Sequence, residues 1–103
     1  MNLPKVYNLV NDNYRSAANQ FVIETPTMKV FQSYQTLIAV KKNGKVTILA
    51  ATLEPCYTGS PSSVTTRKHL YIFLRDHCGL YIHSIRDLKA YVKAGRIRVV
   101  RQF

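Results

Sequence analysis

Residues 36–50 read TLIAVKKNGKVTILA, and this stretch carries the clearest structural signal in the chain. Two apolar runs rich in β-branched residues, 36–40 and 46–50, flank a short polar connection. Asn43-Gly44 lies in that connection, and this dipeptide tolerates the positive φ angles that both central residues of a type I′ turn require. The stretch therefore predicts a β-hairpin that turns at this dipeptide.

Other strands are predicted on both sides of this hairpin. Residues 21–23 are apolar and end before Pro26, and residues 28–32 alternate between apolar and polar side chains, which is the period of a half-buried strand. Near the C-terminus, Arg96–Val99 alternates in the same way and predicts an edge or terminal strand with both arginines directed outward. Residues 52–63 carry prolines, a glycine and serines, so a loop is predicted there.

A first helix is predicted from residue 64 onward. Leu70, Phe73, Leu74 and His77 follow the spacing i, i+3, i+4 and i+7, which places them on one face of a helix. Gly79 comes next and is typical of the left-handed residue that ends a helix.

A second helix is predicted over Ile85–Ala94. Ser84 with Asp87 three residues later resembles a capping box in which Asp replaces the usual Glu. Leu88 and Val92 belong to its buried face, and a glycine follows its last residue.

These elements predict an α+β fold, an antiparallel sheet of four or five strands with two helices packed on one face. Residues 1–20 are polar and rich in asparagine, which competes with regular structure by binding its own backbone, so a loosely ordered N-terminal arm is expected there. Residues 21–103 then form a single α+β domain. Its predicted core consists of Val30, Leu37, Ile38, Ile48, Leu70, Phe73, Leu74, Leu88, Val92, Ile97 and Val99.

Charge is the strongest indication of function. The 103 residues contain 15 Lys and Arg against 5 Asp and Glu, a formal net charge of +10, which favours nucleic acid, another polyanion or an acidic protein as the partner. The 47% hydrophobic content excludes a disordered chain, and two cysteines are too few for a disulfide scaffold. No apolar run approaches about 18 residues and no charged-then-apolar leader begins the chain, so neither a membrane span nor export is expected.

The basic residues are concentrated in the C-terminal part of the chain. Arg86, Lys89 and Lys93 share one face of the second helix, and Arg96 and Arg98 lie on one side of the last strand. A continuous positive strip of this kind is expected to contact phosphates, although a solvated basic face without a partner has the same pattern. The predicted polyanion-binding residues are Arg67, Lys68, Arg75, Arg86, Lys89, Lys93, Arg96 and Arg98.

Seven tyrosines are interleaved with this charge and offer ring faces for base stacking. Tyr34 and Tyr71 are the predicted stacking residues, and Tyr57 and Tyr81 are further candidates. Tyr91 is expected to pack within the fold, because tyrosines beside helices commonly supply amphipathic packing.

No metal, cofactor or catalytic residue is assigned. The five carboxylates are scattered along the chain, too few for a metal-dependent nuclease. A small ribonuclease that uses no carboxylate stays open, with His69, Tyr71 and Arg75 as its candidate residues. The side chains whose spacing matches no zinc-ligand template are Cys56, His69, His77, Cys78 and His83.

Residues 31–39 (FQSYQTLIA) and 65–74 (TTRKHLYIFL) resemble a group of small proteins encoded by bacteriophages and mobile elements. That group shares an F-x-S-Y-x-T-x-I-A stretch and a T-T-x-K-H-L-Y-x-F-L helix, and the similarity spans residues 31–97. Segment 54–63 departs from it, being longer and richer in proline. The resemblance implies a phage-type accessory protein in a bacterial host cytoplasm or a virion, and it transfers no catalytic residue.

The sequence thus predicts a non-enzymatic accessory protein that binds nucleic acid or another polyanion through its basic C-terminal strip. The alternative is a protein-interaction module, either an inhibitor of a host defence factor or a small virion component. The ribonuclease is the third hypothesis.

Overall fold

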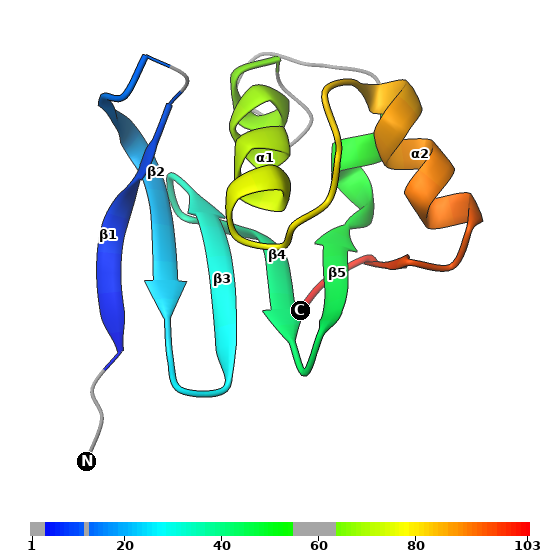
Figure 1. Cartoon of the computed structure of the whole chain (residues 1–103), viewed down its shortest axis with the longest axis horizontal. Coiled ribbons are helices and arrows are strands. Elements are labelled where there is room, and N and C mark those ends of the chain that lie inside the picture. Colours follow the sequence, from blue (N-terminus) through cyan, green and yellow to red (C-terminus); the bar gives the residue numbers. More distant parts are fainter. Residues whose placement is uncertain (1–3, 12, 55–63) are drawn as a thin grey trace.

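Six strands form one sheet beside two α-helices in the computed structural model (Figure 1). The structure describes residues 4–11, 13–54 and 64–103. The strands are β1 Lys5–Val10, β2 Ser16–Glu24, β3 Met28–Ser33, β4 Thr36–Lys42, β5 Lys45–Leu49 and β6 Ile97–Val100. The helices are the short 3-10 helix η1 Ala50–Leu53 and the α-helices α1 Val64–Asp76 and α2 Ile85–Lys93.

The α+β class is confirmed, but the sheet differs from the predicted one in size and direction. Its six strands follow one another in sequence order, and β6 runs parallel to β5 while every other neighbouring pair is antiparallel. The connection from β5 to β6 contains η1, α1 and α2. This crossover brings the chain back to the end of the sheet where β5 begins, so β6 can run parallel to β5. The sheet is therefore mixed, with six strands instead of four or five.

The predicted loosely ordered arm is wrong for the described residues of segment 1–20. They form β1 and the first part of β2, which pair antiparallel at the edge of the sheet. The asparagines belong to the hairpin itself. The Oδ1 of Asn11 accepts the backbone N–H groups of Asn13 and Arg15 in the turn, and Asn8 donates to the carbonyl of Ala17 across the strands at 2.9 Å.

The hairpin at Asn43-Gly44 is confirmed. Asn43 has φ 54° and Gly44 has φ 75°, as a two-residue turn with two positive φ angles requires. Lys42 pairs with Lys45 directly across the turn, and Ala39 pairs with Ile48 further along the two strands. The turn thereby sets the register in the middle of the sheet.

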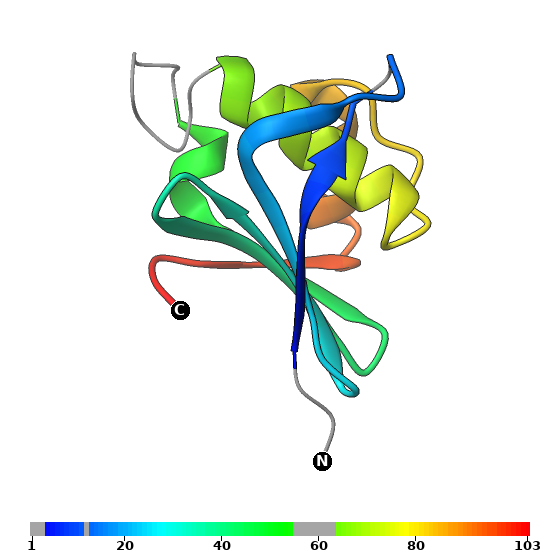
Figure 2. The same cartoon turned by 90° about the vertical axis from the view of Figure 1, so that its left-hand side faces the viewer.

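One hydrophobic cluster joins the sheet to both helices. The ring of Phe31 on β3 stacks on Phe73 of α1, with 5.6 Å between the ring centroids. Val22, Ala39 and other strand residues on this face belong to the same cluster, as does Leu88 of α2. Figure 2 shows the two helices on the same side of the sheet.

Most of the predicted core is buried, namely Val30, Ile38, Ile48, Leu70, Phe73, Leu74, Leu88 and Ile97, and Val92 and Val99 are half-buried against it. The prediction for Leu37 is wrong, because its side chain is 39% exposed. The β3–β4 register shifts at Phe31/Gln32, where Leu37 pairs with Gln32. This bulge buries both Ile38 and Ala39 and leaves Leu37 exposed.

The connections around α1 agree in part with the predictions. The left-handed conformation of Gly79 after α1 is confirmed, with φ 69°. The loop predicted over 52–63 begins with the end of η1, where the Oγ1 of Thr52 donates to the carbonyl of Leu49 at 2.7 Å. The remainder of that loop, 55–63, lies outside the described residues.

Candidate nucleic-acid interface

Helix α2 begins with the predicted cap. The Oγ of Ser84 accepts the backbone N–H of Asp87 at 3.2 Å. The Asp87 carboxylate accepts the backbone N–H of His83 at 2.9 Å, one residue earlier than in the usual capping box. The cap is confirmed, and it uses the carboxylate of Asp87 to hold the segment that enters the helix.

The two sides of α2 have opposite character. Leu88 is completely buried, and Val92 and Tyr91 are half-buried. Arg86, Lys89 and Lys93 are exposed and share one ridge, because residues three, four and seven apart lie on the same side of a helix. The predicted outward orientation of these three cations is confirmed.

The C-terminus of α2 turns the chain back over its last turn. Gly95 has φ 76°, and its N–H donates to the carbonyl of Val92 while the N–H of Arg96 donates to that of Tyr91. This pair of bonds is a Schellman motif, which needs a left-handed residue such as glycine at its centre. The motif returns Arg96 to the helix, and its guanidinium lies 5.1 Å from the centroid of the Tyr91 ring.

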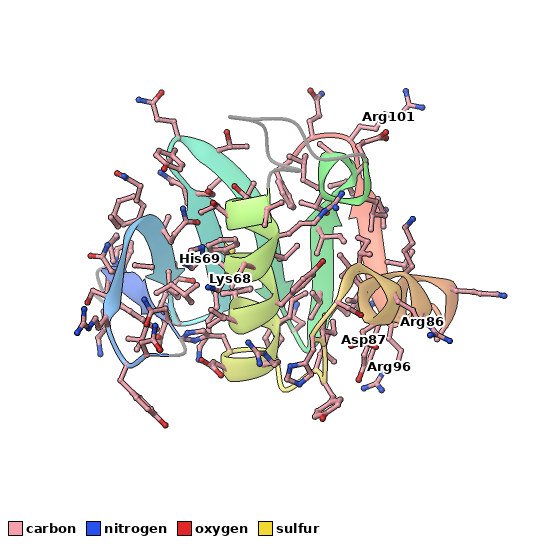
Figure 3. The ribbon with its side chains drawn as sticks, turned by 90° about the horizontal axis from the view of Figure 1, so that it is seen from above. Lys68, His69, Arg86, Asp87, Arg96 and Arg101 are labelled. Atoms are coloured by element: carbon pink, nitrogen blue, oxygen red, sulfur yellow. The ribbon has the colours of Figure 1, made fainter. Side chains whose placement is uncertain are left out.

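We call Arg86, Lys89, Lys93 and Arg96 the α2 basic surface. All four residues are exposed, and Asp87 is the single carboxylate on α2. The group therefore carries four positive charges against one negative charge. In Figure 3 Arg86, Asp87 and Arg96 lie together on one side of α2.

The predicted strip does not continue onto β6. Arg98 pairs with Thr47, whereas Ile97 and Val99 pair with the core residues Val46 and Ile48. Since side chains alternate between the two faces of a sheet, Arg98 points away from the helices and from the α2 basic surface. Arg96 instead lies over Tyr91 of α2, so the prediction that Arg96 and Arg98 share one side is wrong.

The predicted basic residues of α1 are placed apart from α2 or are bound within the fold. The guanidinium of Arg67 donates to the backbone carbonyls of Thr52 (2.7 Å) and Glu54, which fastens α1 to η1. Arg75 donates to the Nδ1 of His83 at 3.0 Å. Lys68 is exposed on α1, away from α2 (Figure 3).

The two predicted stacking tyrosines belong to α1 and to the β3–β4 turn. Tyr71 is half-buried against the hydrophobic cluster. Tyr34 is 58% exposed, but it lies in the β3–β4 turn, where its N–H donates to the carbonyl of Asn19 at 2.7 Å. Tyr57 lies outside the described residues.

Tyr81 is the tyrosine that the structure joins to the side of α2 where Arg96 lies. Its backbone N–H donates to the hydroxyl of Tyr91 at 3.2 Å. The guanidinium of Arg96 lies over the ring of the same Tyr91. The rings of Tyr81 and His83 meet edge to face, with 4.6 Å between centroids. The alternation of apolar and polar residues in Leu80–His83 is the sequence signal that predicts its outward orientation.

A second polar group, which sequence reasoning did not assemble, lies where α1 ends over the sheet. The hydroxyl of Tyr7 donates to Glu24 at 2.9 Å, and the Tyr7 ring lies 6.2 Å from that of His77. His77 also stacks on Phe73, and its carbonyl accepts the ammonium of Lys41 at 3.2 Å. The contributing residues come from β1, β2, β4 and the end of α1, too far apart in the chain for a motif to reveal.

Burial dominates the protonation behaviour of this group. Burial, with a contribution from the charge of Lys29, lowers the pKa of His77 below its usual value. Burial also raises the pKa of Cys78 to about 11. Burial and the hydrogen bond to Glu24 raise the pKa of Tyr7 to about 12. These three groups are therefore held in their neutral forms near pH 7.

An open hollow of about 310 Å³ adjoins this group between the β2–β3 and β4–β5 turns. Glu24, Lys29 and Lys41 line it, and Lys29 pairs in register with both Glu24 and Lys41. The negative charge of Glu24 partly balances the charges of Lys29 and Lys41. The hollow therefore has less net positive charge than the α2 basic surface.

The candidate ribonuclease residues do not converge. His69 and Tyr71 are two residues apart on α1, so they lie on nearly opposite sides of the helix. The Nδ1 of His69 is 2.8 Å from the carbonyl of Thr65. Among the described residues there is no group of three His, Cys, Asp or Glu that could hold a metal ion. None of the helices in the described ranges is long and apolar enough to cross a membrane.

A family model described as a family of unknown function (DUF8033) matches residues 1–83. No curated protein and no solved structure matches the chain. The matched region covers β1 to α1 and ends at His83, so α2 and its basic surface follow it in the chain. The match assigns no catalytic activity, and the bacteriophage context implied by the resemblance stays a prediction.

Proposed function

Because the chain belongs to the DUF8033 family, to which no function is assigned, we propose a function from the geometry of its charged surface: it binds nucleic acid through the α2 basic surface. The observation that carries the proposal is the exposure of four cations on and after one amphipathic helix. Phosphates are the anions that such a surface attracts in a sequence-independent way.

Two details of α2 support a phosphate backbone as the ligand. Arg86, Lys89 and Lys93 lie along one ridge about 10 Å long, given a rise of 1.5 Å per residue. Asp87 is held by the His83 N–H, so its carboxylate is turned to the cap at the start of the helix and not to this ridge. A row of cations can therefore meet successive phosphates without first breaking ion pairs with neighbouring carboxylates.

The test is a charge reversal of this surface. We expect the double variant Lys89→Glu/Arg96→Glu to fold as the wild type does, because both side chains are exposed. It should bind fluorescein-labelled DNA and RNA oligonucleotides at least ~10-fold more weakly, a loss of about 1.4 kcal/mol. The slope of log K against log salt should become smaller by roughly two units, since each phosphate contact contributes about one.

A matched control separates the position of the charge from its amount. The variant Lys42→Glu/Lys45→Glu changes the net charge equally in the β4–β5 hairpin, where both lysines are exposed. It should weaken binding much less than the α2 variant. An equal loss in both variants, or unchanged binding by the α2 variant, contradicts the proposal. Equal binding of polyglutamate and DNA would instead favour an acidic protein as the partner.

A further inference from the structure

The segment between α1 and α2, residues 80–83, presents an aromatic ring to solvent. Leu80 and Ile82 are buried, whereas Tyr81 and His83 are exposed. The Tyr81 side chain is 77% exposed. Because most of this ring is exposed, it contributes little to the stability of the core, and a role in binding would explain an aromatic residue at this position.

Hydrogen bonds hold this segment in place. The backbone N–H of Tyr81 donates to the Tyr91 hydroxyl at 3.2 Å, and that of His83 donates to Asp87 at 2.9 Å. Arg75 donates to the Nδ1 of His83 at 3.0 Å, and since a guanidinium only donates, this nitrogen is the acceptor. The Tyr81 and His83 rings meet edge to face at 68°. Little conformational freedom would therefore be lost when a ligand contacts Tyr81.

Two cations are linked to Tyr81 through neighbouring residues. Arg75 reaches it through His83, which contacts the Tyr81 ring. Arg96 lies over the ring of Tyr91, whose hydroxyl holds the Tyr81 backbone. Proteins bind unpaired bases with exposed aromatic rings and nearby cations, because the base stacks on the ring and the phosphates lie on the cations.

We propose that the ligand of this surface is single-stranded nucleic acid, with one base stacked on Tyr81 and the adjoining phosphate on Arg96 of the α2 basic surface. This inference rests on the proposed function and names its substrate class. The physical reason is that a duplex presents base edges in its grooves but hides the base faces within its stack. The face of Tyr81 can therefore stack only on a base that is unpaired.

The test compares two ligands and three tyrosine variants by fluorescence anisotropy at fixed salt. The probes are a labelled 20-nucleotide oligo-dT strand and a labelled 20-base-pair duplex. We expect Tyr81→Ala to weaken binding of the single strand about tenfold and to change duplex binding less than twofold. Tyr81→Phe should bind the single strand as the wild type does, because it keeps the stacking ring.

Tyr14→Ala is the matched control. Tyr14 is 92% exposed in the β1–β2 turn, at the opposite end of the sheet from α2 (Figure 1), so its loss should leave both affinities unchanged. Salt-dependent binding that Tyr81→Ala does not alter, or an equal loss for strand and duplex, overturns this inference and leaves the proposed function intact. Absence of binding to both probes overturns both.

Discussion

His77 shows how a single residue acquires properties that its own sequence neighbours do not supply. Its ring lies between Phe73 and Tyr7, and Lys41 binds its carbonyl. Burial and the nearby lysine charges favour the neutral imidazole, so its pKa lies below the ordinary value of 6.5. Stability therefore depends on pH through this residue.

The sign of this dependence follows from proton linkage. Above about pH 6.5 the imidazole is neutral in both the folded and the unfolded chain, and its full contribution to stability is present. Below that pH the unfolded chain takes up the proton first, so stability is lost as the pH falls. We expect His77→Phe, which keeps a ring in place, to lose less stability than the wild type between pH 7.5 and pH 5 in urea denaturation. Equal losses would contradict this assignment, since the remaining titratable groups are common to both proteins.

At the scale of one element, α2 combines a cap, an amphipathic face and a chain reversal within a short segment. Ser84 and Asp87 begin the helix, and Leu88 anchors it to the core. Gly95 ends it and brings Arg96 back over Tyr91. The arrangement of the α2 basic surface thus depends on the glycine as well as on the cations.

Substitution of Gly95 tests this dependence. A Cβ at this position would have no atom within 4 Å, so the expected cost comes from the backbone conformation alone, with φ at 76°. We expect Gly95→Ala to lower the free energy of unfolding by about 1 kcal/mol, and Gly95→Asn to lower it less, because Asn tolerates the left-handed region better. Chemical denaturation measures both. Equal stability of the alanine variant and the wild type would show that the reversal after α2 does not require a left-handed residue.

At the scale of the whole molecule, the N-terminal strands are part of the same sheet as the central hairpin. Leu9 of β1 is 1% exposed and belongs to the hydrophobic cluster that contains Phe31 and Phe73. Val6 lies on the same strand, yet it is 63% exposed. Substitutions at these two positions therefore test whether β1 contributes to the core or only pairs with the edge of the sheet.

We therefore expect Leu9→Ala to destabilise the protein by about 3 kcal/mol, because it removes buried methyl groups and leaves a cavity. Val6→Ala should cost about 0.5 kcal/mol or less. Both values come from urea denaturation followed by circular dichroism. A loss for Leu9→Ala no greater than that for Val6→Ala would mean that the first strand contributes little to the core.

The arm predicted over residues 1–20 shows why part of the fold could not be predicted. Asparagine content indicated irregular structure, and Asn11 does organise a turn, but strands run on both sides of it. Ala17 and Leu9 are buried through pairing and packing partners from other parts of the chain. Composition over a short window does not contain those partners.

In the candidate site, too, some features followed from local sequence and others depended on distant contacts. The exposure of Arg86, Lys89 and Lys93 followed from helical periodicity. The link from Tyr81 to Arg96 through Tyr91 did not, because it depends on a hydrogen bond from Tyr81 to Tyr91 that joins two separate segments.

Features controlled by short-range physics could be predicted from the amino-acid sequence. These are the turn at Asn43-Gly44, the cap at Ser84 and the reversal at Gly95, each set by the φ preference of one residue or by a hydrogen bond across a few residues. Only the tertiary structure decided that β6 runs parallel to β5, that Arg98 faces away from α2, and that Arg67 is bound to backbone carbonyls. Those outcomes depend on which strands pair and which faces are buried, and contacts between distant parts of the chain determine both.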